Sequence, residues 1–130
     1  REGDVTGNEL VLLVDDEEAI IEFAQEALER SGYRVLTAGN GLDAVEKFIE
    51  KVDEIQLVVF DLTMPRMSGE EIFLSMKRIK PHCRFIVSTG HNQLHVEEKE
   101  LQEVDAVLHK PYRPRQLLET IRTVLTRTDG

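Results

Sequence analysis

Five polar residues, widely separated along the chain, are of the types that carry phosphoryl chemistry: Asp15, Asp16, Asp61, Thr89 and Lys110. Carboxylates held close together repel one another, and the pKa of at least one of them rises unless a cation is bound. Magnesium prefers oxygen ligands and is usually held by one or two carboxylates together with a phosphate. A carboxylate can also attack a phosphoryl group to give an aspartyl phosphate, whose charge a metal, an ammonium and a hydroxyl stabilise. The residue types therefore predict a Mg2+-dependent phosphoryl site, with Asp61 as the nucleophile and Asp15 and Asp16 as metal ligands.

These residues meet only if the elements that precede them form one sheet. Apolar runs typical of β-strands occur at residues 10–14, 34–38, 56–60, 84–88 and 105–108. The first run ends directly before Asp15, the third directly before Asp61 and the fourth directly before Thr89, while Lys110 follows the fifth. The carboxyl ends of parallel strands lie at one edge of a sheet, where ligands bind. The sequence therefore predicts that all these side chains line one cleft.

Between the runs, apolar residues recur at helical spacing, most clearly at residues 20–28 and 117–125. Residues 68–71 (Ser-Gly-Glu-Glu) have the spacing of a capping box, and Gly32 fits the end of the first helix. The segment 92–103 has the weakest helical pattern. Strand and helix alternate five times, which favours right-handed crossovers and a parallel sheet covered on both faces. The predicted fold class is α/β, a three-layer sandwich.

Composition excludes several classes of protein. Of the 130 residues, 41% are hydrophobic and 32% charged, as in a globular domain, and the net charge of −9 disfavours direct binding to nucleic acid or anionic lipid. No apolar run approaches the roughly 20 residues that span a bilayer, so no membrane insertion is expected. A single cysteine, Cys83, forms no internal disulfide, which favours the cytoplasm. We expect residues 1–8 to be a linker, 9–127 the domain and 128–130 a tail.

Each candidate residue also has a purely structural interpretation. Asp15 and Asp16 could favour the positive end of the following helix, Asp61 could be a turn residue and Lys110 could be solvated. Their joint arrival at four of five predicted strand ends favours a site. Other residues are interpreted structurally. His91 and His95 have metal-ligand spacing without an evident third ligand, and His82 and His109 are expected to be exposed. We expect Cys83 to be a buried or half-buried packing residue, and the acidic stretch 97–103 to be a solvated helix face or, as a minority interpretation, a docking surface.

The motifs VDDEE, FDLTMPRMSG, STGH and HKPY make residues 9 to about 126 resemble a receiver domain of the two-component response-regulator family. The resemblance implies a flavodoxin-like (βα)5 fold with strand order 2-1-3-4-5. It implies that Asp61 is the phospho-acceptor, that Asp15, Asp16 and the backbone carbonyl of Thr63 bind Mg2+, and that Thr89 and Lys110 contact the phosphoryl group. It also implies a sensor histidine kinase or a histidine phosphotransfer protein as donor, an unidentified protein as downstream partner, and a homodimer as one possible assembly.

One position departs from the family's pattern: Val107 stands three residues before Lys110, where receiver domains often carry a Tyr or Phe that moves with the switch threonine. Thr63 and His91 resemble the positions that tune the lifetime of the phosphoryl group.

Three interpretations of function stay open. The first is a phosphorylation-controlled switch that is not an enzyme by itself, either alone or as the receiver module of a hybrid histidine kinase. The second is a Mg2+-dependent phosphohydrolase with an aspartyl-phosphate intermediate. Against it, phosphatases of the haloacid-dehalogenase type carry a second Asp two residues after the nucleophile, and this chain has Thr63 there. The third is an interaction domain with a degenerate site.

Overall fold

A single parallel sheet organises the computed structural model, which describes residues 5–61, 69–90 and 104–127. Its strands follow the order β2-β1-β3-β4-β5, and each pairs in parallel with its neighbour. Their bounds are β1 Leu10–Val14, β2 Arg34–Ala38, β3 Ile55–Asp61, β4 Arg84–Thr89 and β5 Ala106–His109. The predicted α/β class, the flavodoxin-like topology and the strand order 2-1-3-4-5 are confirmed.

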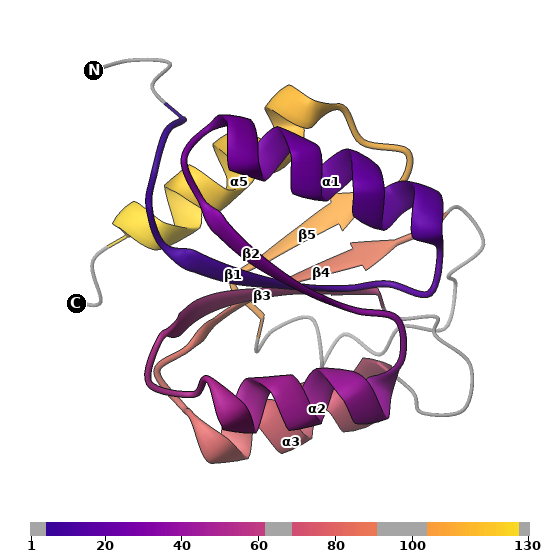
Figure 1. The fold of residues 1–130 in the computed structure, drawn as a ribbon, viewed down its shortest axis with the longest axis vertical. Coiled ribbons are helices and arrows are strands. Elements are labelled where there is room, and N and C mark those ends of the chain that lie inside the picture. Colours follow the sequence, from indigo (N-terminus) through magenta and orange to yellow (C-terminus); the bar gives the residue numbers. More distant parts are fainter. Residues whose placement is uncertain (1–4, 62–68, 91–103, 128–130) are drawn as a thin grey trace.

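Helices cover both faces of the sheet (Figure 1). On one face lie α1 (Glu18–Arg30) and α5 (Pro114–Thr126), and on the other lie α2 (Gly41–Glu50) and α3 (Gly69–Ile79). The two apolar layers are separate: one packs β1, β3 and β4 against α1 and α5, and the other centres on the rings of Phe48, Phe60, Phe73 and Phe85. Burial on both faces explains why β1 and most of β3 and β4 read as continuous apolar runs.

The ends of the helices follow local sequence. As predicted, the first helix ends just before Gly32, whose φ of +98° lies in the left-handed region. The amide of Gly32 donates to the carbonyl of Glu29 and the amide of Tyr33 to that of Leu28, the paired hydrogen bonds of a Schellman motif. A Cβ at Gly32 would stand 2.4 Å from the carbonyl oxygen of Gly7, so only glycine fits there. Ser68 and the segment 92–103 lie outside the described residues.

The strand ends differ from prediction by one residue, and this affects the site. Asp61, Thr89 and His109 are the last residues of β3, β4 and β5, whereas the sequence places the strand ends one residue earlier. The ladder continues because Asp61 pairs with Ser88 and Thr89 pairs with His109. These side chains are therefore fixed by the pleat of the sheet and not by a loop.

Cys83 is buried as predicted, with 3% of its surface exposed, and burial raises the pKa of its thiol to about 11. Relative to its ordinary value of 9.0, this lowers the thiolate fraction near neutral pH by about a hundredfold. We therefore expect an aromatic disulfide reagent at pH 8 to label the folded chain very slowly and the urea-unfolded chain at once. A Cys83→Ser chain that carries His82→Cys at the exposed neighbouring position is the control and should label rapidly when folded. Fast labelling of the folded wild type would contradict the burial of this thiol.

No helix in the described part of the chain is long and apolar enough to cross a membrane.

Candidate functional site

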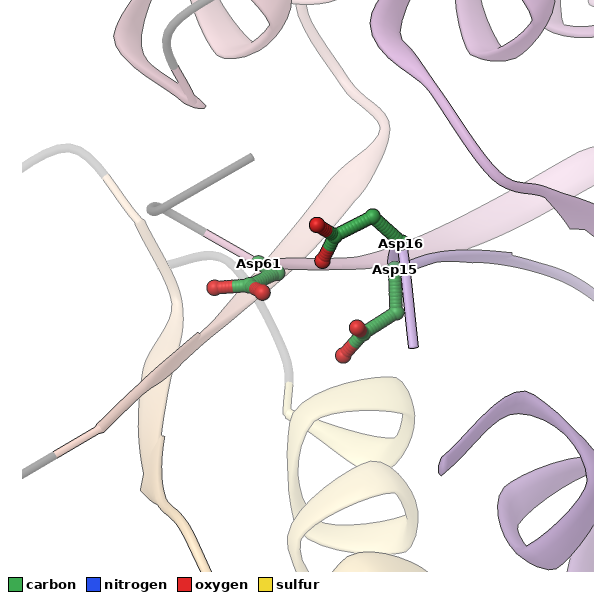
Figure 2. Close-up of side chains that lie close together, drawn as sticks. All are labelled: Asp15, Asp16 and Asp61. Carbon is green, nitrogen blue, oxygen red and sulfur yellow. The ribbon is translucent and has the colours of Figure 1, made fainter. Parts of the chain in front are cut away.

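Three carboxylates meet at the carboxyl edge of the sheet. Asp15 and Asp16 follow β1, Asp61 ends the adjacent strand β3, and one oxygen from each lies within 4.8 Å of the others. Figure 2 shows the carboxyl groups gathered beyond the two strand ends, with that of Asp16 turned toward Asp61. The central strands β1 and β3 are neighbours, which brings together residues far apart in the sequence.

Lys110 lies between two of these carboxylates. Its Nζ is 2.9 Å from Oδ2 of Asp15 and 3.0 Å from Oδ2 of Asp61. The three side chains are nearly closed to solvent, with exposed fractions of 14% for Lys110, 6% for Asp15 and 2% for Asp61. The alternative that Lys110 is merely solvated is wrong. Because the Lys110 ammonium contacts both carboxylates, its positive charge stabilises Asp15, just after β1, and Asp61, at the end of β3, together.

Asp15 also serves the local backbone. Its Oδ1 accepts a hydrogen bond of 2.9 Å from the amide of Glu17, the N-cap residue of α1, so Asp15 does have the structural role at the start of this helix. Burial raises the pKa of Asp15. The Glu17 amide and Lys110 oppose this shift, and the charge of Asp61 adds a smaller push in the same direction as burial. The expected rise in the pKa of one carboxyl is confirmed, but desolvation causes more of it than repulsion does.

The ammonium of Lys110 stays charged in this setting. Burial alone would lower its pKa, but hydrogen bonds to Asp15 and Asp61 and the charges of both carboxylates outweigh burial, so the pKa is raised. Three carboxylates and one ammonium leave the cleft with a formal charge of −2. The ligand atoms are all oxygens, and the remaining charge matches one divalent cation, so these residues fit Mg2+.

Thr89 is 6% exposed. It contacts His109, the last residue of β5, and Lys110, which follows that strand. The backbone amide of Lys110 donates to the Thr89 carbonyl at 2.7 Å, and the Thr89 hydroxyl lies 3.2 Å from Nδ1 of His109. His109 is exposed, as expected, but its contact with Thr89 was not predicted. The strand pairing could have indicated this contact. The strands β4 and β5 are parallel, and their last residues, Thr89 and His109, pair with each other.

A cavity of about 510 Å³ opens beside Lys110. Ile20 and Phe23 of α1 form one wall, and Lys110, Pro111 and Tyr112 form another. The rings of Tyr112 and Phe23 are 5.9 Å apart, and burial, aided by the charge of Asp15, raises the pKa of Tyr112 to about 12. Neither Phe23 nor Tyr112 was predicted to lie beside the site.

The structure thus brings together Asp15, Asp16, Asp61 and Lys110, and it places Thr89 on the neighbouring strand end. Thr63, His91 and His95 lie outside the described residues, as does the acidic stretch 97–103. His82 is exposed, as expected.

Comparison with known proteins gives a consistent result. Residues 11–122 match the family described as the response regulator receiver domain. The chain is 31% identical over 131 residues to the sensor kinase CckA of Brucella abortus, which covers 97% of this chain and 13% of that protein. It is 35% identical over 118 residues to the response regulator SaeR of Staphylococcus aureus, covering 90% of this chain and 50% of SaeR. The chain therefore spans at most half the length of these two relatives.

Among solved structures, a response regulator receiver domain protein from Clostridium thermocellum superposes with a TM-score of 0.85 at 32% identity. The match covers 92% of this chain and 95% of that one. The fold is therefore shared over nearly the whole length of both chains.

Proposed function

This chain belongs to the response regulator receiver domain family, and from that premise we propose that Asp61 accepts a phosphoryl group from a phosphohistidine in a Mg2+-dependent reaction. Receiver domains act in two-component signalling. The observation that carries it is the shared ammonium of Lys110, which contacts Asp61 and Asp15 at 3.0 and 2.9 Å inside a cluster of three carboxylates. An acidic turn with a purely structural role does not require a largely buried lysine that contacts the carboxylates of Asp15, after β1, and Asp61, at the end of β3.

The proposed transfer is a single displacement at phosphorus. A carboxylate oxygen of Asp61 attacks, and the new P–O bond forms as the P–N bond of the phosphohistidine breaks. The electron pair of the broken bond stays on the imidazole nitrogen of the donor. Lys110 stabilises the negative charge on the transferring oxygens, and the hydroxyl of Thr89 donates to one of them once the group is on Asp61. Asp15 accepts a hydrogen bond at Oδ1 from the amide of Glu17, which ties this carboxylate to the start of α1.

Asp15, Asp16 and Asp61, with the backbone carbonyl of Thr63, are the proposed ligands of Mg2+. Bound there, the metal ion supplies positive charge to the transferring phosphoryl oxygens. The oxygen donor set and the charge of −2 support this assignment. The chain's own contribution is to hold the carboxylates at fixed strand ends, so that no side chain has to be gathered when the phosphoryl group arrives.

The wider role follows from these assignments. We expect the phosphorylated domain to dock another protein, either as a response regulator or as the receiver module of a hybrid kinase. We propose residues 9–127 as the functional domain, with 1–8 as a linker and 128–130 as a tail. Similarity to a sensor kinase and to a response regulator supports both settings. We place the reaction in the cytoplasm, where kinases that use ATP form phosphohistidine. The domain catalyses its own modification and is not proposed to turn over a metabolite.

Incubating the chain with phosphoramidate tests this function. With Mg2+ we expect intact mass to rise by one phosphoryl group, and with EDTA we expect little or no adduct. Equal labelling in both conditions would overturn the metal assignment. Continuous release of inorganic phosphate from metabolite phosphomonoesters, without a lasting adduct, would instead support the alternative of a Mg2+-dependent phosphohydrolase.

A further inference from the structure

The contact between Thr89 and His109 joins a buried hydroxyl to an exposed side chain. Thr89 Oγ1 lies 3.2 Å from His109 Nδ1, and the two residues are register partners at the last rung of β4 and β5. Only 6% of Thr89 is exposed, whereas His109 lies at the surface. A change at the hydroxyl therefore has a direct path to solvent through one imidazole ring.

The side chains of Val107, His109 and Thr89 share one face of the sheet. Phe85 and Val87 pack into the apolar layer on the α2 and α3 side, and because side chains alternate along a strand, Thr89 faces the same way. Val107 packs against that layer too, and His109 follows it by two residues. Valine has no hydrogen-bonding group, so Val107 cannot bond the threonine hydroxyl, and His109 is the residue of β5 that does.

Resting on the proposed function, we propose that His109 is a positioning residue for Thr89 and transmits the phosphorylation state of Asp61 to the surface. In the proposed state before transfer, the imidazole of His109 carries its proton on Nε2, and Nδ1 accepts a hydrogen bond from the Thr89 hydroxyl. A hydroxyl has one proton to donate, and phosphoryl oxygens only accept, so Thr89 cannot donate to both. Contact with a phosphoryl group on Asp61 therefore ends the donation to His109 and changes the hydrogen bonding of the imidazole.

The ring itself reports this change. Beryllofluoride with Mg2+ is added as a phosphoryl mimic to a chain labelled with 15N-histidine, and the His109 ring signals are assigned by their loss in His109→Asn. We expect the Nδ1 signal of His109 to move in the wild type and to stay in place in Thr89→Val, with the concentration of the mimic raised until it saturates this variant, because loss of the Thr89 hydroxyl weakens its binding. Binding without movement of the His109 signal in the wild type would overturn this inference and leave the proposed function intact. Failure of the mimic to bind at all would count against the proposed function, and the His109 assignment would fall with it.

Variants at His109 provide a second, functional test. His109→Leu removes the acceptor, so the Thr89 hydroxyl no longer has to leave it, and we expect beryllofluoride to bind roughly twofold to tenfold more tightly, the ratio that one net hydrogen bond supports. His109→Asn retains a polar group near the position of Nδ1 and should restore affinity close to that of the wild type. His82→Leu, at an exposed histidine that precedes β4, is the matched control and should leave affinity unchanged. Equal affinities of His109→Leu and the wild type would overturn the positioning role.

Discussion

Replacing Asp61 with asparagine should abolish phosphoryl labelling of the chain, a loss of at least about a thousandfold that takes the adduct below detection by intact mass. The amide is nearly isosteric with the carboxylate but lacks the negatively charged oxygen that attacks phosphorus. The Asp61 side chain is 2% exposed at the end of β3 and lies 3.0 Å from Lys110, so the substitution changes the chemistry of the site more than its shape. The measurement is the fraction of chain carrying one phosphoryl group after incubation with phosphoramidate and Mg2+.

The matched control is Asp53→Asn, the same substitution at an exposed carboxylate shortly before β3. This variant should label as fast as the wild type. If Asp61→Asn labels at the wild-type rate, the acceptor is another residue, and fragmentation of the labelled chain would show whether Asp15 or Asp16 carries the group. If the unlabelled Asp61→Asn has the same unfolding midpoint in urea as the wild type, loss of fold is excluded as the cause.

Replacing Lys110 with methionine should slow labelling of Asp61 by about a hundredfold to a thousandfold, the usual effect of deleting one preorganised group that stabilises transition-state charge. Methionine keeps the unbranched aliphatic stem but removes the ammonium that contacts Asp15 and Asp61. The formal charge of the cleft then changes from −2 to −3, so Mg2+ should bind at least as tightly as in the wild type. A slower transfer with undiminished Mg2+ affinity separates the role of Lys110 from that of the metal ligands.

Lys51→Met is the control for this variant, because Lys51 is an exposed lysine whose ion pair with Glu54 lies at the surface. It should label like the wild type. An unchanged labelling rate in Lys110→Met would contradict the assignment of Lys110 to the transferring phosphoryl group. Removing the ammonium also takes a positive charge away from the buried carboxylates of Asp15 and Asp61, so labelling is compared at saturating Mg2+, with the folded fraction checked by urea unfolding.

Much of the fold could be predicted from the chain alone because burial leaves a periodic signal. The continuous apolar run of β1 and the one-sided pattern of α1 each follow from how many faces the element buries. Gly32 is equally local, since a positive φ at a helix end demands a residue without a Cβ. The ends of β3 and β4 were harder: Asp61 and Thr89 are polar, so hydrophobicity stops before them although pairing does not.

The candidate site divides in the same way. That Asp15, Asp16 and Asp61 would gather at one edge follows from their place after parallel strands, which is readable in the sequence. That Lys110 bridges Asp15 and Asp61, and that His109 bonds Thr89, depends on side-chain contacts between segments up to 95 residues apart. No periodic pattern records such contacts.

By itself, then, the sequence determined the alternation of strands and helices and the residue types at the cleft, because the hydrophobic period is a property of each element. The strand order followed from the resemblance that the motifs carry. Only the tertiary structure decided that Asp15 and Asp61 share the ammonium of Lys110 and that burial is the largest cause of the raised pKa of Asp15. The contact between the exposed His109 and the buried hydroxyl of Thr89 was likewise decided by the tertiary structure. These outcomes depend on distances of about 3 Å and on exclusion of water, and both arise only when distant strands pack side by side.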